Sequence, residues 1–347
     1  MRNHYVIDGS YNLCNTFGIQ RFSKEITAFL DMTPDAGNRF TVLIPEYCPE
    51  PAPLNNIPII RYGSHKGKLW RQLDLARYLK MKDSKLLAYE NIIPLACRRG
   101  VVVMHDIIYR SRPDLFLSGL KSIRSICYQR LVYHCVMTSG MRIVTVSEFS
   151  RAEIIKYYGL PSSKIAIVGN GWEHMNRIVP EDIPETLRDY VRDPYLFAVA
   201  SSSTKHKNLA WFFRAAGNNP SMTFVIAGGI SEKDRRGCPE NIHFTGYVSD
   251  GVMKSLMQHC SAFLFPSFYE GFGIPPLEAA AAGAGRLILS DIPVLHEIYG
   301  ESAHYIDPFG NGDELPWILQ ASPADYTALL SQHTWSAAAE KMLKLLE

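Results

Sequence analysis

The chain has 347 residues, which is long for one typical domain and comfortable for two. Its net charge of +2 hides an uneven split, because residues 1–172 carry 23 Lys and Arg against 13 Asp and Glu, and residues 173–347 carry 13 against 21. The N-terminal residues do not read as a signal peptide, no apolar run is long enough to span a membrane, and the seven cysteines form no C-x-x-C pair, so we expect a cytoplasmic protein with reduced thiols.

In the first half, short apolar runs alternate with helical patterns. The runs are rich in β-branched residues and apolar throughout, as strands buried on both faces of a parallel sheet are. Helical periodicity predicts helices over residues 18–30 and 150–158, the second with Gly159 as its C-cap. The predicted strands are residues 5–7, 40–44, 101–104, 142–146 and 164–168.

The same alternation starts again near Pro194. Prolines among charged residues mark 176–194 as a linker. We therefore predict an α/β protein with two Rossmann-like parallel-sheet domains, residues 1–175 and 195–325. In the second domain the predicted strands are residues 195–200, 222–227, 242–244, 262–265 and 286–289, with a helix over 209–216.

The most informative stretch runs from Pro266 to Gly283 and reads PSFYEGFGIPPLEAAAAG. A predicted strand ends at its start, a glycine-containing loop holds Glu270, and two prolines then open a helix. The N-terminus of that helix suits phosphate, and we place Glu278 in its first turn. Carboxylates bind hydroxyls, so the stretch fits a ligand with phosphates and hydroxyls, such as a nucleotide sugar. Either glutamate alone could instead be a solvated residue or complement the helix dipole.

The segment E-G-F-G-I-P-P-L-E resembles the signature of glycosyltransferase family 4, the retaining enzymes with the GT-B fold. That resemblance implies two Rossmann-like domains that face each other across a cleft, with a C-terminal helix, residues 333–347, crossing back to the first. It extends along nearly the whole chain. The other similar segments are Asp8, G-I-Q-R-F at 18–22, V-M-H-D at 103–106, T-V-S-E-F-S at 145–150, G-N-G at 169–171, K-N-L at 207–209 and Trp335.

The resemblance implies a role for each matching residue. Glu270 would bind hydroxyls of the donor sugar, at or near the 3-position. Lys207 would neutralise the diphosphate leaving group. His105 would lie near the reacting carbon and the acceptor hydroxyl, although it could also be a buried structural histidine. Glu278 would bind the ribose hydroxyls.

The remaining donor-binding residues follow from the same resemblance. Gly18 would let the first loop approach the diphosphate, unless it is a plain helix-start glycine. The backbone at Phe272, Gly273 and Ile274 would support the sugar and phosphates. Tyr247 and Val248 would line the base pocket.

Two departures from the family pattern concern positive charge. Serines stand at positions 201–203, where the family often has an arginine, and His206 stands where it usually has another. One phosphate-facing cation is therefore missing, unless Lys205 supplies it. No Asp-x-Asp segment follows a strand and there is no Cys/His ligand set, so we expect neither a metal nor a cofactor. Lys207 and a helix N-terminus can supply the electrostatics.

Positive charge gathers in two segments of the first half. Residues 61–85 hold eight Lys and Arg against two Asp, and residues 110–142 hold six against one acid. Leu69, Leu73, Ala76 and Leu79 share a helical face in the first segment. Such helices can lie on anionic lipid, although they can also pack inward with a solvated basic face. No nucleic-acid-binding motif accompanies the charge.

The sequence thus predicts a retaining, metal-independent hexosyltransferase. The resemblance implies a nucleotide-sugar donor and a lipid-linked or oligosaccharide acceptor, with peripheral contact at the inner face of the cell membrane, in O-antigen, capsule or lipopolysaccharide assembly. One alternative is a GT-B-like nucleotide-sugar epimerase or hydrolase, and another is a non-catalytic sugar-binding relative. A nicotinamide dehydrogenase is disfavoured, because no G-x-G-x-x-G follows the first strand of either half.

Overall fold

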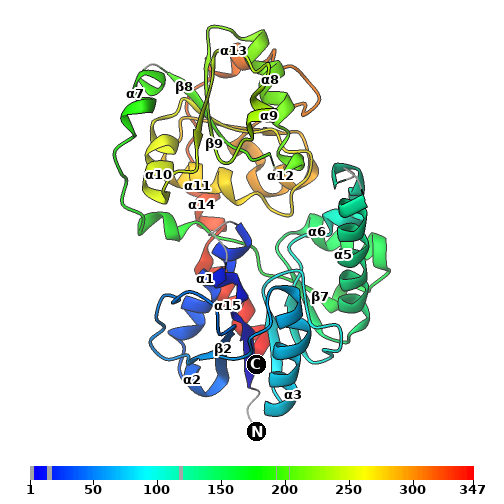
Figure 1. Ribbon diagram of the computed structural model, residues 1–347. Helices are drawn as coiled ribbons and strands as arrows, with labels where there is room; N and C mark the ends of the chain where they lie inside the picture. Colours follow the sequence, from blue (N-terminus) through cyan, green and yellow to red (C-terminus); the bar gives the residue numbers. More distant parts are fainter. Residues whose placement is uncertain (1–3, 14–17, 117–119, 193, 203) are drawn as a thin grey trace. The chain divides into compact units, whose positions relative to one another are not determined.

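The computed structural model describes residues 4–13, 18–116, 120–192, 194–202 and 204–347, with the backbone alone at 120–122 (Figure 1). The chain forms two compact units. Unit 1 comprises Met1–Asn170 with Trp335–Glu347, and unit 2 comprises Gly171–Thr334.

Unit 1 is built on a sheet in which every pair of neighbouring strands is parallel. Its strands are β1 (Tyr5–Asp8), β2 (Phe40–Ile44), β3 (Ile59–Arg61), β4 (Lys85–Ala88), β5 (Gly100–Val103), β6 (Arg142–Thr145) and β7 (Ile165–Ile167). They lie in the order β3-β2-β1-β4-β5-β6-β7, with Val6 opposite Thr41 on one side and Leu86 on the other. The chain therefore winds outward from β1 in one direction and resumes at β4 in the other.

Helices and short turns of unit 1 connect these strands. They are η1 (Gly9–Leu13), α1 (Gly18–Asp31), α2 (Ala36–Arg39), the π-helix η2 (Trp70–Leu75), α3 (Ala76–Lys82), α4 (Ile108–Ser111), η3 (Pro113–Phe116), α5 (Leu120–Thr138), α6 (Glu148–Tyr158), η4 (Ser162–Lys164) and α15 (Trp335–Leu346). Helix α6 begins after Ser147, whose hydroxyl accepts the Ser150 N–H at 3.0 Å, and it ends at the expected C-cap Gly159.

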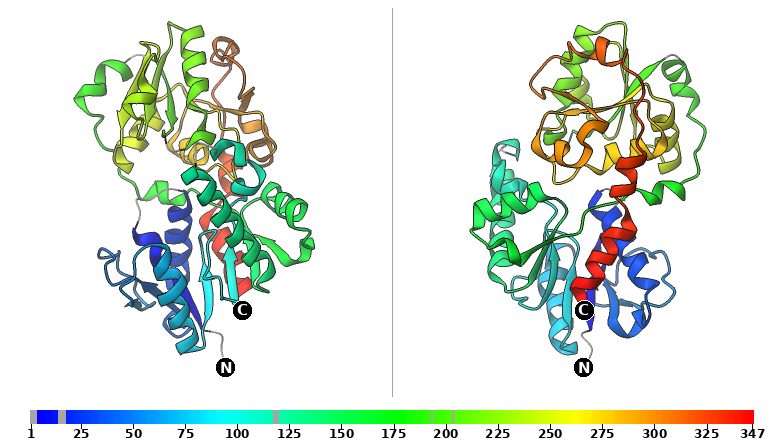
Figure 2. Two further views of the ribbon diagram at one scale, coloured as in Figure 1. Left: turned by 45° about the vertical axis from the view of Figure 1, so that its right-hand side comes forward. Right: turned by 180° about the vertical axis from the view of Figure 1, so that it is seen from behind.

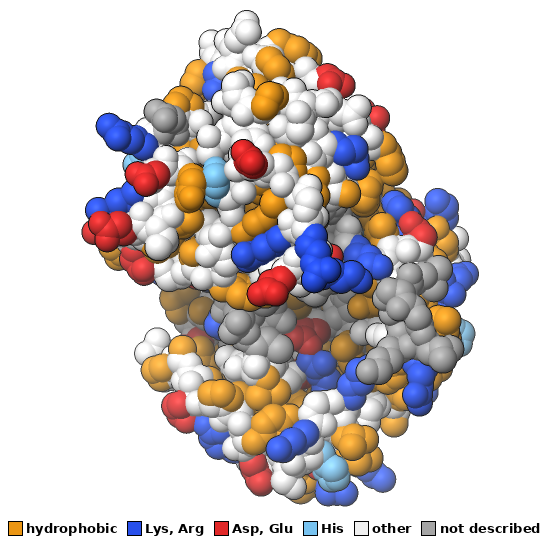
Figure 3. Space-filling view, turned by 45° about the horizontal axis from the view of Figure 1, so that its top comes forward, with side chains coloured by type: hydrophobic (Ala, Val, Ile, Leu, Met, Phe, Trp, Pro, Cys, Tyr) orange, Lys and Arg blue, Asp and Glu red, His pale blue; other side chains and the backbone are white. Residues whose placement is uncertain are grey.

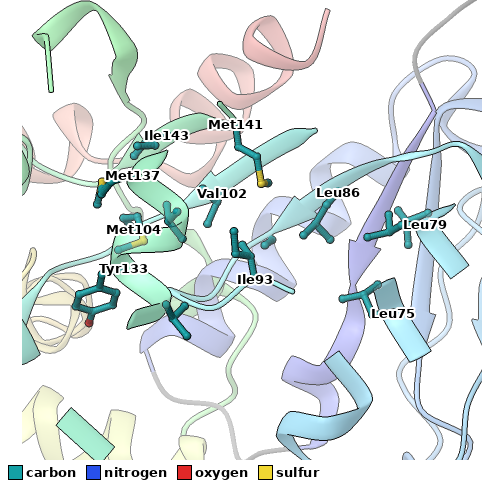
Figure 4. Close-up of a cluster of buried hydrophobic side chains, with 14 of the residues drawn as sticks. Leu75, Leu79, Leu86, Ile93, Val102, Met104, Tyr133, Met137, Met141 and Ile143 are labelled. Atoms are coloured by element: carbon teal, nitrogen blue, oxygen red, sulfur yellow. The ribbon is translucent and has the colours of Figure 1, made fainter. Parts of the chain in front are cut away.

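The core of unit 1 covers both faces of its sheet. One face packs against η2, α3, α5 and α6, and Figure 4 shows part of this cluster, with Leu86, Val102 and Ile143 from the strands and Leu75 and Met137 from the helices. Strand side chains that point the other way are also buried, among them Ile7, Leu87, Val101 and Val144. Burial on both faces explains why these strands read as unbroken apolar runs.

The last helix of the chain belongs to unit 1. Helix α15 packs along α1, and the ring centroid of Trp335 lies 6.0 Å from that of Phe22 in an edge-to-face arrangement. Figure 2 shows α15 and α1 side by side in both views. The Arg142 guanidinium donates to the Leu345 carbonyl at 3.2 Å, which ties the end of α15 to β6.

Unit 2 repeats the parallel architecture. Its strands are β8 (Tyr195–Val199), β9 (Thr223–Ala227), β10 (Ile242–Gly246), β11 (Ala262–Phe265), β12 (Leu287–Ser290) and β13 (His304–Ile306), in the order β10-β9-β8-β11-β12-β13. All neighbouring strands are parallel, with Phe197 of β8 opposite Val225 on one side and Phe263 on the other.

Helices again cover this sheet. They are η5 (Glu173–Asn176), α7 (Glu185–Val191), η6 (Lys205–Lys207), α8 (Leu209–Asn218), α9 (Glu232–Arg235), α10 (Asp250–His259), α11 (Ile274–Ala282), α12 (Pro293–Tyr299), η7 (Gly300–Ser302), α13 (Leu315–Ile318) and α14 (Thr327–Gln332). On one face Trp211 and Phe212 of α8 and Leu315 of α13 pack on strand residues such as Leu264 and Ile288.

The segment expected to be a linker, residues 176–194, differs from that expectation. Its residues group with unit 2 and include helix α7. Lys254 of α10 donates to the carbonyls of Met175 and Ile178 at 2.7 and 2.9 Å, and the Ser255 hydroxyl donates to the Glu181 carbonyl at 2.6 Å. These bonds hold the proline-containing segment against α10.

The expected α/β fold class with two Rossmann-like parallel sheets is confirmed. The expected apolar face of residues 61–85 is corrected in part. Trp70 and Leu79 are buried, whereas Leu69 and Leu73 are exposed, because residues 70–75 form a π-helix whose wider turn shifts the expected face. Within the described ranges, no helix combines the length and the apolar character that a membrane span requires.

Candidate functional site

Each sheet reverses its strand order at one point, between β1 and β4 in unit 1 and between β8 and β11 in unit 2. In open parallel sheets, ligands bind beyond the carboxyl ends of the strands at such a switch point. In unit 2 the segments that leave these two ends are η6 and residues 266–273. The motif singled out in the sequence therefore lies where the topology predicts a ligand site.

Hydrogen bonds fix the two segments side by side. The Phe268 N–H donates to the His206 carbonyl at 2.8 Å. The Asn208 side-chain amide donates to the carbonyls of Pro266 and Pro308 at 3.0 and 2.7 Å. Asn208 itself has φ 58°, a left-handed conformation that asparagine tolerates better than most residues. One backbone hydrogen bond and the buried Asn208 side chain thus hold the two segments together.

The structure brings the expected residues Lys207 and Glu270 together. The ammonium nitrogen lies 2.8 Å from Glu270 Oε1, and it also lies 4.2 Å from the centroid of the Phe265 ring. The two side chains are 19% and 12% exposed, so the ion pair is partly buried yet reachable. A fixed cation and a carboxylate acceptor therefore share one corner of the switch point.

The second glutamate has a different partner. Glu278 Oε1 lies 2.9 Å from Nε2 of His174, whose side chain is 2% exposed on η5. Glu278 is the fifth residue of α11, so the expectation that it lies in the first turn is corrected. The helix begins one residue before the first proline, because Gly273 acts as its N-cap with φ 91°.

The start of α11 is closely fixed. A Cβ on Gly273 would lie 3.0 Å from Leu295 Cδ2, so glycine suits both the backbone angle and the space. The Tyr299 hydroxyl donates to the Gly273 carbonyl, and burial, with a smaller contribution from Glu278, raises the pKa of Tyr299 well above its usual value. Phe272 is buried edge-to-face against His333, with centroids 5.5 Å apart, and Ile274 is buried as well. Pro275 and Pro276 carry no N–H, so the donors that this helix start can present in a fixed orientation are the N–H groups of Gly273 and Ile274.

The charges near η6 differ from the family pattern as the sequence indicated. Lys205 is exposed, at the start of η6. Burial lowers the pKa of His206 to about 4, so this imidazole is neutral near pH 7 and does not replace an arginine. Its Nδ1 is buried and has no hydrogen-bond partner among the described residues.

The serines that follow β8 hold a neighbouring loop. The Ser202 N–H donates to the Gly229 carbonyl at 3.0 Å, and the Ser202 hydroxyl accepts the Ser231 N–H at 2.8 Å. Ser203 lies outside the described residues. These contacts give Ser202 a structural function at the position where the family often carries a cation.

The residues expected to line a base pocket follow β10. The Tyr247 side chain lies over the backbone of Gly229. A Cβ placed on Gly229 would be only 2.7 Å from the Tyr247 hydroxyl oxygen. Tyr247 is 68% exposed and Val248 is half-buried. An exposed ring resting on backbone at a sheet edge can stack on a planar ligand.

The site residues expected in unit 1 are Gly18 and His105. Gly18 is the exposed first residue of α1, and residues 14–17 before it lie outside the described residues. His105 is buried, 4.9 Å from the Phe22 ring, and its Nε2 donates to the Tyr89 carbonyl at 2.8 Å. Burial lowers the pKa of His105 to about 4, so this histidine is neutral.

The switch point of unit 1 holds a charged cluster that the sequence analysis missed. Arg71 Nε lies 2.8 Å from Asp8 Oδ2, and the same guanidinium pairs with Glu90. Its NH2 group also donates to the Ser10 hydroxyl oxygen at 2.6 Å. The side chains of Arg71, Asp8 and Glu90 are 12%, 4% and 17% exposed. Asp8 ends β1 and Glu90 follows β4, so the cluster spans the two central strand ends.

Two family models match this chain. The model described as Glycosyltransferase Family 4 matches residues 18–174, and the model described as Glycosyl transferases group 1 matches residues 182–315.

Curated relatives and a solved structure agree with these matches. The O-antigen chain mannosyltransferase RfbU of Salmonella typhimurium is 28% identical over 71% of this chain and 66% of its own length. O-antigen chain mannosyltransferase B of Escherichia coli is 28% identical over 62% of this chain and 59% of its own length, so the chain spans less than two thirds of either relative. The Anabaena protein HepE, solved with UDP and glucose, is 16% identical, covers 100% of this chain and 99% of its own, and has a TM-score of 0.69.

Proposed function

This chain belongs to the glycosyltransferases of family 4 and group 1, which have the GT-B fold, and on that premise we propose that it moves a hexose or deoxyhexose from a nucleotide-sugar donor to a glycan acceptor. The observation that carries the proposal is the pairing of Glu270 with Lys207 at the switch point of unit 2, beside the N-terminus of α11. The relatives named for O-antigen mannosyl transfer support a place in surface-polysaccharide assembly.

The donor site proposed here lies in unit 2. Lys207 would meet the diphosphate, with the backbone N–H groups of Gly273 and Ile274 at the start of α11 as the second positive element and Lys205 as a third. Glu278 would accept hydrogen bonds from the ribose hydroxyls, and the exposed ring of Tyr247 would stack on the base, with Val248 beside it. Gly229 supports this arrangement because its bare backbone leaves room for the tyrosine ring.

The chemistry proposed is retaining. The bond between the sugar carbon C1 and the phosphate oxygen breaks, and the acceptor oxygen bonds to C1 on the same face. The hydroxyl proton goes to the leaving phosphate, and nucleoside diphosphate is released. Lys207 would stabilise the charge that develops on that phosphate, and Glu270 would hold the donor sugar through its hydroxyls. The neutral His105 of unit 1 is proposed to lie near the acceptor hydroxyl as a hydrogen-bonding group.

We also propose that transfer requires no metal and no cofactor, because Lys207 supplies a fixed positive charge for the leaving group. Transfer measured after exhaustive treatment with EDTA should equal transfer with added Mg²⁺ or Mn²⁺. A rate that collapses on chelation and returns with one of these ions would contradict this part of the proposal.

The acceptor is proposed to be lipid-linked and met at the inner face of the cell membrane, through a basic surface of unit 1. The exposed side chains of Leu69, Leu73 and Met81 lie among exposed cations of the same segment, including Lys80 and Lys82. On the face drawn in Figure 3, hydrophobic, basic and acidic side chains are interspersed. Apolar anchors among cations suit an anionic lipid surface.

Vesicle sedimentation tests this contact. Binding to vesicles with anionic phosphatidylglycerol should exceed binding to neutral phosphatidylcholine, and added salt should weaken it. The double variant Lys80→Gln/Lys82→Gln should bind roughly thirtyfold more weakly, at about 1 kcal/mol per cation. The matched control in unit 2, Lys233→Gln/Arg236→Gln, should bind vesicles as the parent does. An equal loss of vesicle binding in the two double variants would show that the membrane-contacting surface is assigned wrongly.

The proposed transfer is tested first through donor binding. UDP, GDP and dTDP, with their common sugar conjugates, are added to the purified protein and the unfolding midpoint is measured. A nucleotide at a hundred times its Kd adds about 2.7 kcal/mol, which shifts the midpoint by several degrees at roughly 2–4 °C per kcal/mol. The mannose conjugate of the nucleotide that raises the unfolding midpoint most is then the first donor to test with lipid-linked acceptors.

Each outcome of that assay has a clear meaning. Transfer of labelled sugar into an acceptor with the donor's anomeric configuration, read by NMR, supports the proposal. Inversion of the configuration overturns the retaining chemistry. Release of free sugar or an epimer at the same rate without acceptor favours a hydrolase or epimerase, and no binding of any nucleotide favours a non-catalytic relative.

A further inference from the structure

His174 is a buried residue that neither the motif nor its spacing singled out. Its side chain is 2% exposed, and its Nε2 lies 2.9 Å from Oε1 of Glu278, 104 positions away in the sequence. The Glu278 side chain is 19% exposed. One carboxylate oxygen is therefore engaged inside the protein while the side chain stays within reach of a ligand.

The turn that carries His174 is anchored on both sides. Lys254 of α10 donates to the Met175 carbonyl at 2.7 Å. The Trp172 indole donates to the Leu330 carbonyl of α14 at 2.9 Å. Both anchors belong to unit 2, as His174 and Glu278 do, so the imidazole is a fixed point against which the glutamate is oriented.

A glutamate on a helix can adopt several rotamers, and each one directs its carboxylate differently. A buried N–H that donates to one oxygen selects a single rotamer, and the cost of ordering the side chain is met before a ligand arrives. The second oxygen, together with the remaining lone pair of the first, is left to accept hydrogen bonds from two adjacent hydroxyls.

From these contacts we infer that His174 is a positioning residue, which holds Glu278 in the orientation that accepts the ribose hydroxyls and so sets the preference for ribonucleotides over deoxyribonucleotides. The inference rests on the proposed function, because it concerns the same donor site. It adds a residue outside the family signature, and a property, the discrimination between ribose and 2′-deoxyribose, that can be measured without any transfer assay.

Calorimetric titration tests the inference. The Kd values of UDP and GDP, and of their 2′-deoxy forms, are measured with the unaltered protein and with His174→Leu, His174→Asn and His174→Gln. The ratio of deoxy to ribo Kd should fall about tenfold in His174→Leu, as expected when a hydrogen bond to a charged group is lost. His174→Asn should behave in the same way, because the shorter amide cannot reach Glu278, whereas His174→Gln should restore most of the ratio.

The ratio separates positioning from general damage. If His174 had a purely structural role, its replacement would weaken the binding of ribonucleotides and deoxyribonucleotides equally. An unchanged ratio in His174→Leu and His174→Asn would therefore overturn this inference and leave the proposed function intact. His243→Leu is the matched control, because it removes a half-buried imidazole of unit 2 that stacks on Tyr190 at 3.6 Å, and it should leave the ratio intact. If the unaltered protein binds neither these four nucleotides nor dTDP, the proposed function fails and this inference fails with it. Binding of dTDP in preference to UDP and GDP would overturn the inference and leave the proposed function standing, because dTDP lacks the 2′-hydroxyl.

Discussion

Units 1 and 2 both place charged side chains at the switch point of a parallel sheet, but they pair these charges differently. In unit 1, Arg71 lies between Asp8 and Glu90 and also contacts Ser10, so the cation is shared among several acceptors inside the fold. In unit 2, Lys207 meets one carboxylate, Glu270. The first arrangement is saturated by the protein itself, whereas the second keeps hydrogen-bonding capacity for a ligand.

Charge at a strand end therefore does not by itself mark a binding site. A guanidinium that satisfies two carboxylates mainly stabilises the fold, because removing it leaves buried charge without compensation. An ammonium has three N–H donors, so Lys207 can keep its bond to Glu270 and still donate to a phosphate. Variants that remove each cluster in turn should therefore differ in whether they lower stability or ligand binding and turnover.

The largest effect is expected for Arg71→Met. This change leaves Asp8 and Glu90 in a mostly buried position without their cation, which should destabilise unit 1 by about 3–5 kcal/mol, as measured by urea unfolding. Nucleoside diphosphate binding by unit 2 should survive. Arg99→Met is the matched control, since the Arg99–Asp83 pair is 58% and 86% exposed and should contribute less than about 1 kcal/mol. Equal losses of unfolding free energy in Arg71→Met and Arg99→Met would contradict the stabilising role of the buried cluster.

Glu270→Gln in unit 2 should act on turnover rather than on stability. The amide cannot match the carboxylate's acceptor strength toward the donor sugar, and we expect transfer to fall by roughly 10²–10³-fold, the range seen when one oriented hydrogen-bonding group is removed from an active site. The Kd of the nucleoside diphosphate should stay within a few-fold of the parent value. The exposed Glu240→Gln is the control, and full turnover by Glu270→Gln would show that the site is assigned wrongly.

Buried His105 predicts an acid limb in the stability of unit 1. Its pKa is lowered from 6.5 to about 4 by burial, so between these values the unfolded chain binds a proton that the folded protein does not. Stability contributed by the neutral imidazole is complete above pH 6.5, falls as the pH decreases toward 4, and is lost below it, a change of about 3 kcal/mol. Urea unfolding of His105→Gln at several pH values should show a flatter limb, and an unchanged slope would contradict the burial argument.

The smallest effect is expected at Gly229. In Gly229→Ala the new methyl group meets the Tyr247 ring, which is 68% exposed and can swing away, so stability should change by less than about 1 kcal/mol. Nucleotide binding should nevertheless weaken several-fold, because the ring loses its place beside the base. Gly228→Ala is the contrasting variant, since its Cβ would lie 2.0 Å from the Ala200 carbonyl at φ 120° and should disrupt the loop. If Gly229→Ala binds nucleotide as tightly as the parent, Tyr247 is not part of the nucleotide site.

The fold was predictable where strands are buried on both faces. Runs such as those of β2 and β11 are apolar throughout, and the structure confirms them. The strands that went unpredicted give weaker signals. Strand β4 contains leucines rather than β-branched residues, while β3 is a half-exposed edge strand and β13 begins with a histidine. Their pairing depends on neighbours far away in the sequence, which a local pattern does not reveal.

The candidate site divides in the same way. Glu270 and Lys207 were found because each belongs to a short motif, and the structure places them in contact. His174 and Arg71 were missed, because neither belongs to a short motif and only folding brings them to partners 104 and 63 positions away. Glu278 was predicted in the first turn of its helix but lies beyond it. The reason is that Gly273, in a left-handed conformation, caps the helix so that it begins before the prolines.

The place of α15 has a consequence for the order in which the protein is made. Unit 1 needs residues 335–347, yet a ribosome adds them only after all of unit 2. Until then α1 lacks the helix against which it packs, and the Phe22 ring lacks its neighbour Trp335. Unit 2 can therefore mature during translation as a continuous segment, whereas unit 1, although begun first, is completed last and leaves apolar surface to chaperones in the interval.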